Sequence, residues 1–219
     1  MATDFIAVVK TRGYVTLRNL PSCSSLEAFP EVGRLLQAGP VGAKSRYNSD
    51  EGLLHTDLAN WFVPPQYLAL FCVDGAVDIG IRLLDSNSVI SALGEYRFGG
   101  ALVQPHDPID GRRSLIRLLD SDPGIGRLFR WDPGLLSAAT SYSAEVLSSI
   151  AKHLAEANPD DIVRLRPGAA LILDNWRMLH ARATGVALDD YRRLERAYFG
   201  IHQQVEYTPA TQETNDKPM

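Results

Sequence analysis

The apolar runs of this chain are short, and glycine and proline interrupt them along its whole length. The sequence has 17 glycines and 13 prolines among 219 residues. Runs such as Gln66–Val73 and Ala169–Asp174 suit a buried strand and are short for a helix. The regular helix–strand alternation of a doubly wound parallel sheet is missing, and so is any GxGxxG or P-loop motif. The pattern therefore predicts a mainly β sandwich or barrel with flanking helices.

Individual elements can be predicted from periodicity and from turn residues. The strongest helix is Ser143–Ala157, where Val146, Ile150 and Leu154 recur at helical spacing. Further helices are expected over Leu26–Gln37 and Ser86–Phe98. The expected strands are Phe5–Val9, Tyr14–Leu17, Gln66–Val73, Asp78–Leu84, Ser114–Leu119, Arg127–Trp131, Ile162–Leu165, Ala169–Asp174 and Leu194–Gln203.

Size and charge narrow the class of protein further. We expect one domain over residues 1–207 and a polar, disordered tail over 208–219. The net charge of −4 argues against nucleic-acid binding, and no apolar run is long enough to span a membrane. An acidic residue stands near the N-terminus, where a signal peptide needs a basic one, so we expect a cytoplasmic protein. Two cysteines cannot supply a four-thiolate site, so any metal must be bound by histidine and carboxylate.

Two distant segments offer such ligands. His55 and Asp57 are two residues apart, so on a strand their side chains point the same way. His180 follows an apolar strand and a turn, and it is the best candidate for a third ligand. Two imidazoles and one carboxylate form the facial triad of non-haem Fe(II) oxygenases, which leaves three metal positions open. A His-x-Asp sequence alone is weak evidence, because most such pairs are surface or capping residues.

Four motifs in order strengthen this interpretation. They are Arg12–Arg18 (RGYVTLR), His55–Asp57 (HTD) with Pro64-Pro65 after it, Pro167–Arg182 (PGAALILDNWRMLHAR), and Arg192–Arg196 (RRLER). In this combination the chain resembles the taurine dioxygenase/clavaminate synthase-like superfamily of Fe(II)- and 2-oxoglutarate-dependent oxygenases, over most of its length. The resemblance implies a double-stranded β-helix core, also called a jelly roll or cupin-like fold.

The resemblance also implies roles for individual residues. His55, Asp57 and His180 would bind Fe(II), and Arg192 would bind the far carboxylate of 2-oxoglutarate, with Arg193 as the alternative if the strand register slips. Arg196, four residues after Arg192, would bind an acidic group of the substrate. Asn60 and Trp61 would contact the substrate from the loop after the metal motif, although Trp61 can equally be a core or rim aromatic. Asn175 is expected to fix the turn before His180 through backbone hydrogen bonds.

One position departs from the family pattern. Relatives carry a threonine in the strand after the double proline, where its hydroxyl helps to bind 2-oxoglutarate. Here the corresponding segment, residues 78–82, reads DIGIR and has no threonine. Arg82 is the candidate replacement donor, with a solvent-exposed arginine as the alternative.

The implied reaction uses 2-oxoglutarate and O2 and releases succinate and CO2. The carboxylate ligand Asp57 argues against halogenation, and hydroxylation of an unactivated C–H bond in a small molecule, an amino acid or another small acid, is the default. Desaturation and ring closure use the same ligands. Two rival functions stay open: a cupin-type metal-dependent dioxygenase or isomerase that does not use 2-oxoglutarate, and a non-catalytic binding protein on the same fold.

Overall fold

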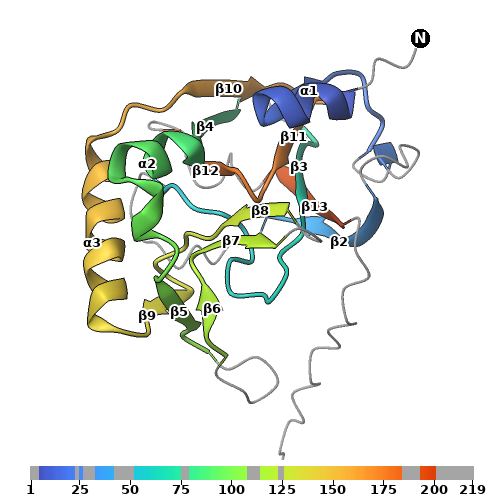
Figure 1. The fold of residues 1–219 in the computed structure, drawn as a ribbon. Coiled ribbons are helices and arrows are strands. Elements are labelled where there is room, and N and C mark those ends of the chain that lie inside the picture. The colour runs from blue at the N-terminus through green and yellow to red at the C-terminus, as the bar shows by residue number, and fades with distance from the viewer. Residues whose placement is uncertain are drawn as a thin grey trace, which may run out of the picture.

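The computed structural model contains a five-stranded antiparallel sheet, the largest of its sheets (Figure 1). The structure describes residues 5–22, 25–26, 33–41, 52–74, 79–107, 114–122, 126–183 and 193–200. In order across the sheet, the strands are β1 (Tyr14–Leu17), β11 (Ala170–Asp174), β3 (Tyr67–Cys72), β13 (Leu194–Gly200) and β2 (Arg34–Pro40). Each neighbouring pair is antiparallel. Spatial neighbours are distant in sequence, as a jelly roll requires.

A second antiparallel sheet packs against the inner face of the first. Its strands are β10 (Asp161–Leu165), β4 (Ile79–Asp85) and β12 (Met178–Arg182), in that order. Ile81 and Leu83 of β4 lie in one buried cluster with Leu68 of β3, Leu171 of β11 and Tyr198 of β13. Alternate residues of both sheets therefore fill a common interior, which confirms the predicted jelly-roll core.

The flanking elements cover the outer faces of the two sheets. Helix α1 (Phe5–Arg12) packs on the five-stranded sheet through a cluster that includes Tyr67. The outer face of the second sheet is covered by α2 (Ser86–Leu93), the 3-10 helix η3 (Glu95–Arg97), α3 (Ser141–Glu156), a small sheet of β6 (Ile116–Arg117), β5 (Leu102–Pro105) and β9 (Leu136–Ala138), and the hairpin β7 (Leu119–Asp122)–β8 (Gly126–Phe129). Among the described helices, none has the length and apolarity needed to cross a membrane.

Two predictions for the N-terminal part were wrong. The expected strand Phe5–Val9 is part of α1, because Phe5, Ile6 and Val9 are buried on one helical face. Gly13 ends this helix at φ 88°, and a Cβ there would collide with the sulfur of Met178.

The expected helix Leu26–Gln37 is also contradicted where the structure describes it. Residues 34–37 belong to β2, which pairs with β13 along its length. Tertiary pairing therefore outweighs the local helical pattern. Residues 27–32 lie outside the described ranges, and so do residues 201–219 with the predicted tail.

Asp174, at the end of β11, is an acidic residue with a raised pKa in the turn that leads to His180. Its carboxylate accepts a hydrogen bond from the backbone N–H of Trp176 at 3.0 Å. Burial raises the pKa of Asp174 from 3.8 to about 6, although this hydrogen bond and Arg177 oppose the shift. A raised carboxyl pKa contributes stability that is complete below the unfolded pKa and is lost as the pH rises through the folded pKa.

We expect Asp174→Asn, which keeps an acceptor oxygen, to stabilise the protein more at alkaline than at acidic pH. From the raised pKa, the gain in unfolding free energy should be about 1 kcal/mol larger at about pH 8 than at about pH 5. Urea denaturation of both proteins at the two pH values measures this difference. An equal gain at both values would contradict the burial of a charged Asp174.

Candidate metal centre

His55, Asp57 and His180 converge in the interior of the jelly roll, as the sequence predicted. His180 lies in β12, and His55 forms an isolated antiparallel bridge with it. Their backbones exchange two hydrogen bonds, of 3.1 Å from His55 N–H and 2.9 Å from His180 N–H. Each of the three side chains offers one ligand atom, and these atoms all lie within 4.8 Å of one another. The backbone bridge thus holds two distant segments in register at one site.

The side chains face a common point. Oδ1 of Asp57 is 3.3 Å from Nε2 of His55 and 3.7 Å from Nε2 of His180. The two ring centroids are 4.6 Å apart. The His180 side chain is 2% exposed and that of His55 22%, so the cluster is buried on one side and open on the other. Two imidazole nitrogens and a carboxylate oxygen in this arrangement fit a divalent iron ion.

Hydrogen bonding and burial set the protonation of these ligands. Nδ1 of His55 lies 2.7 Å from the carbonyl oxygen of Leu53 and donates to it as an N–H, which directs Nε2 at the cluster. In the neutral ring Nε2 offers a lone pair there, and in the protonated ring it donates to Asp57. Burial lowers the pKa of His180 to about 3, so this ring is neutral at physiological pH. Burial alone would raise the pKa of Asp57, but the hydrogen bond with His55 and the charge of Arg196 hold it far below its usual range. The carboxylate is therefore ionised. For His55, burial favours the neutral ring, but Asp57 outweighs it and raises the pKa.

The turn before His180 fixes the backbone of Asp57. Oδ1 of Asn175 accepts a hydrogen bond from the N–H of Asp57 at 2.8 Å. The Asn175 amide nitrogen donates to the carbonyl of Asp57 at 2.9 Å and to that of Pro65 at 3.0 Å. Asn175 is 1% exposed and bonds to backbone groups, as predicted, but its side chain holds Asp57 and Pro65 instead of its own turn. The preceding residue, Thr56, donates its backbone N–H to the carbonyl of Trp131, and its hydroxyl oxygen accepts from the N–H of Trp131.

Asn175→Asp should therefore weaken metal binding without removing a ligand. The aspartate keeps one acceptor, loses both donors, and places a buried negative charge against two carbonyl oxygens. We expect the affinity for a divalent metal to fall about 10- to 100-fold, as for other partners that orient metal ligands. Calorimetric titration with Co2+ measures this, with Asn87→Asp on the exposed start of α2 as control. An unchanged affinity would show that Asp57 holds its position without Asn175.

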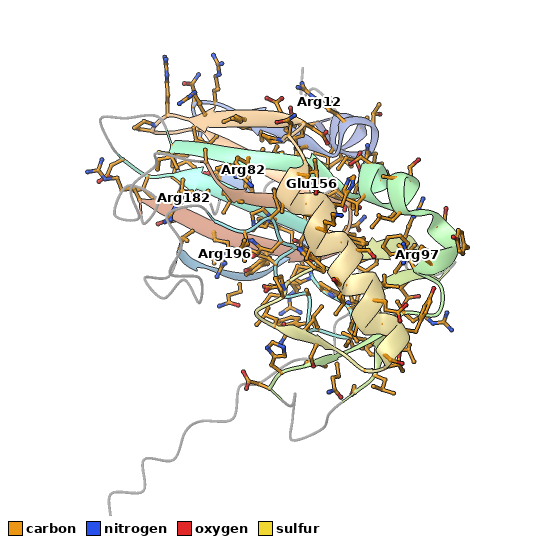
Figure 2. All side chains as sticks on the ribbon, turned by 90° about the vertical axis from the view of Figure 1, so that its left-hand side faces the viewer. Arg12, Arg82, Arg97, Glu156, Arg182 and Arg196 are labelled. Atoms are coloured by element: carbon orange, nitrogen blue, oxygen red, sulfur yellow. The ribbon has the colours of Figure 1, made fainter. Side chains whose placement is uncertain are left out.

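Arg196 and Tyr198 of β13 reach the cluster from the five-stranded sheet. Arg196 is labelled in Figure 2. They alternate with Ala197, so both face the interior. Nη1 of Arg196 is 3.2 Å from Oδ2 of Asp57, and the Tyr198 hydroxyl donates to the same oxygen at 2.8 Å. Arg196 therefore lies beside the site, and its contact with substrate stays a prediction, whereas sequence reasoning gave Tyr198 no role. The signal was available, because Tyr198 shares strand parity with Arg196.

Of the other predicted arginines, the structure describes Arg82 and Arg193, and neither lies at the cluster. Leu83 is the register partner of His180, and Arg82 is the partner of Ala181, so Arg82 starts on the opposite face of the sheet from His180. This placement does not support the expectation that Arg82 binds 2-oxoglutarate. Side chains of neighbouring residues on a strand point to opposite faces of the sheet, so a position one residue away faces the other side. Arg193 is 3.8 Å from Asp74 at an exposed position. Arg192 lies outside the described residues.

The loop after Asp57 is held by an arginine that the sequence analysis missed. Asn60 and Trp61 lie in this loop, and their contact with substrate stays a prediction. Arg130 is 1% exposed and donates from Nη1 to the carbonyl of Trp61 at 2.9 Å and from Nη2 to that of Phe62 at 2.7 Å. Its Nε donates to the carbonyl of Arg117 at 3.0 Å. Three backbone carbonyls, two of them in the loop after Asp57, thus accept from one buried cation.

Comparison with known proteins gives matches in structure and none in sequence. No protein-family model and no curated protein matches the chain. Asparagine oxygenase in complex with Fe(II), (2S,3S)-3-hydroxyasparagine and succinate superposes with a TM-score of 0.66 at 18% identity, over 90% of this chain and 78% of that one. PvcB, an Fe, α-ketoglutarate dependent oxygenase from an isonitrile synthetic pathway, gives 0.61 at 18% identity, with coverage of 90% and 78%.

A third match is the non-haem iron oxygenase OrfP in complex with Fe and L-canavanine. Its TM-score is 0.61 at 16% identity, with coverage of 91% of this chain and 79% of that one. At such identities the likeness concerns the fold. The chain therefore has the jelly-roll fold of the Fe(II)- and 2-oxoglutarate-dependent oxygenases, the fold of the superfamily that its sequence motifs resemble.

Proposed function

We propose that this protein is an Fe(II)- and 2-oxoglutarate-dependent oxygenase that oxidises a C–H bond of a small amino acid or another small acid. The observation that carries this proposal is the convergence of His55, Asp57 and His180 on one point inside a fold shared with such oxygenases. A ferrous ion bound there would supply the chemistry that couples decarboxylation of 2-oxoglutarate to oxidation of the substrate by O2. The chain itself supplies ligands, orientation and partial exclusion of water.

Arg196 supports an acidic substrate. Its guanidinium lies inside the jelly roll with a side chain 34% exposed, so it is accessible from the open side of the metal centre. A guanidinium donates two parallel hydrogen bonds to a carboxylate, which orients the bound molecule. The asparagine oxygenase structure contains a hydroxylated amino acid, and the OrfP structure contains an amino acid. We therefore assign Arg196 to the substrate carboxylate, and Arg192 to 2-oxoglutarate.

Formation of succinate tests the proposal. Protein loaded anaerobically with Fe2+ is mixed with 2-oxoglutarate, O2 and a panel of amino acids and small carboxylic acids. We expect slow succinate formation without substrate and faster formation with one group of related amino acids. Metal binding without succinate from any mixture would overturn the proposal and favour a metal enzyme that does not use 2-oxoglutarate. A protein that binds no metal would favour a binding function.

Arg196→Lys should separate substrate binding from the reaction of 2-oxoglutarate alone. Lysine keeps the positive charge near Asp57 but cannot donate in a bidentate fashion. We expect KM for the substrate acid to rise about 10- to 100-fold, the cost of one charged hydrogen bond, with a much smaller change in succinate formation without substrate. Arg193→Lys, at the exposed start of the same strand, is the control. An unchanged KM would remove Arg196 from the substrate site.

A further inference from the structure

The two carboxylate oxygens of Asp57 have different surroundings. Oδ1 faces the two imidazoles, at 3.3 Å from His55 and 3.7 Å from His180. Oδ2 faces away from them and receives the Tyr198 hydroxyl at 2.8 Å and Arg196 at 3.2 Å. The carboxylate is therefore divided into an oxygen directed to the metal position and an oxygen already engaged by two donors.

We propose that Tyr198 is a positioning residue whose hydroxyl holds Oδ2, so that Asp57 binds the metal through Oδ1 alone. The inference rests on the proposed function, because it requires a metal at the triad. Bidentate binding by Asp57 would have to break the hydrogen bond from Tyr198 and the contact with Arg196. Tyr198 is 3% exposed in a strand that is paired on both sides, by β2 and by β3, so its ring cannot move away easily.

The hydrogen bond from Tyr198 to Oδ2 of Asp57 would determine how many coordination positions of the metal stay free. With one oxygen from Asp57 and one nitrogen from each histidine, an octahedral metal keeps three positions for other molecules. A bidentate Asp57 would leave two, too few for a chelating co-substrate and O2 together. The Tyr198 ring also lies under the Arg196 guanidinium, 5.1 Å from its central carbon, so the same residue orients the arginine assigned to the substrate.

The chain contains a matched control for this arrangement. Arg12 and Tyr14 are also two residues apart, and Tyr14 donates to Oδ2 of Asp161. Arg12 is 3.2 Å from that same oxygen and lies 4.6 Å from the Tyr14 ring centroid. Among the described residues, Asp161 belongs to no group of potential metal ligands. A Tyr→Phe substitution can therefore remove the tyrosine hydroxyl from each of two Arg–Tyr–Asp groups. Only the group with Tyr198 contains a proposed metal ligand.

The experiment compares Co2+ binding by wild type, Tyr198→Phe and Tyr14→Phe, measured by calorimetry on metal-free protein and by the visible absorption of bound Co2+. We expect Tyr198→Phe to lose about 10- to 100-fold in affinity and to change the Co2+ spectrum, because a partner that fixes a metal ligand is lost. Tyr14→Phe should match wild type in both. Thermal unfolding of the metal-free proteins reports the structural cost of each substitution separately.

The outcomes separate this inference from the proposed function. A folded Tyr198→Phe with wild-type affinity and spectrum would overturn the inference, while succinate formation by wild type would leave the proposed function standing. Wild-type protein that binds no metal would overturn both. If Tyr198→Phe does not fold, a crystal structure of wild type with Mn2+ decides: one coordinating Asp57 oxygen with Oδ2 still on Tyr198 supports the inference, and two coordinating oxygens overturn it.

Discussion

Asp57→Ala is expected to reduce iron-dependent conversion of 2-oxoglutarate to succinate by at least about 100-fold. Removal of a residue that only hydrogen-bonds a metal ligand lowers metal affinity or activity by about 10- to 100-fold, and removal of the ligand itself should cost more. The substitution removes the one carboxylate among the three ligands and leaves two imidazoles and Arg196 at the site. We expect the fold to remain, at a cost of about 1–3 kcal/mol for the lost hydrogen bonds to a buried charge. Succinate formation and circular dichroism on the same preparations measure the two effects.

Asp161→Ala is the matched control for this substitution. Asp161 likewise pairs with an arginine and a tyrosine, but on β10 with a side chain 40% exposed. This variant should keep the activity of wild type. Wild-type succinate formation by a folded Asp57→Ala protein would contradict the assignment of Asp57 as a ligand.

Arg130→Met is expected to give the largest loss of stability, about 3 kcal/mol, because it removes a buried cation and leaves the carbonyl oxygens of Trp61, Phe62 and Arg117 without their donor. Arg130 is 1% exposed, and burial lowers its pKa to about 10, so it remains charged at neutral pH. Arg130→Lys should recover part of the loss, since one ammonium cannot reach the carbonyls of both Arg117 and Phe62 with the same geometry. Urea denaturation of the metal-free proteins measures the free energy of unfolding.

Arg127→Met, on β8 just before Arg130, provides the comparison for an exposed arginine. Arg127 pairs with Glu95 at 3.2 Å, with side chains 43% and 64% exposed. Such a surface pair contributes at most about 1 kcal/mol. Equal small losses for Arg127→Met and Arg130→Met would show that Arg130 does not hold the loop at Trp61 and Phe62.

The parts of the fold that local pattern could predict are those whose burial follows chain periodicity. Helix α3 and strands β3 and β11 lie close to the predicted ranges, because their apolar residues face one core at regular spacing. Helix α1 has only 8 residues, too few for periodicity to distinguish it from a strand. Strand β2 owes its conformation to pairing with β13, which no local pattern encodes.

The same distinction holds within the site. His55 and Asp57 could be predicted as a ligand pair from their spacing, and His180 from its place after an apolar strand. The expected strand over residues 53–57 was wrong, because His55 forms only an isolated bridge and Asp57 begins a turn. The face of Arg82 depends on its register with Ala181, and a register cannot be determined from one strand alone. Strand parity puts Tyr198 on the same face as Arg196, but only the structure shows that its hydroxyl donates to Asp57. Arg130 stands between Phe129 and Trp131, and nothing local shows that its partners are carbonyls of a distant loop.

Binding of iron to the three ligands can be measured by anaerobic equilibrium dialysis of Fe2+ against wild type, His180→Ala and His106→Ala, the last an exposed histidine outside the cluster. We predict one tightly bound equivalent of iron per chain for wild type and for His106→Ala, and none for folded His180→Ala. Iron binding by His180→Ala equal to that of wild type, or no iron binding by wild type, would contradict a metal centre at His55, Asp57 and His180.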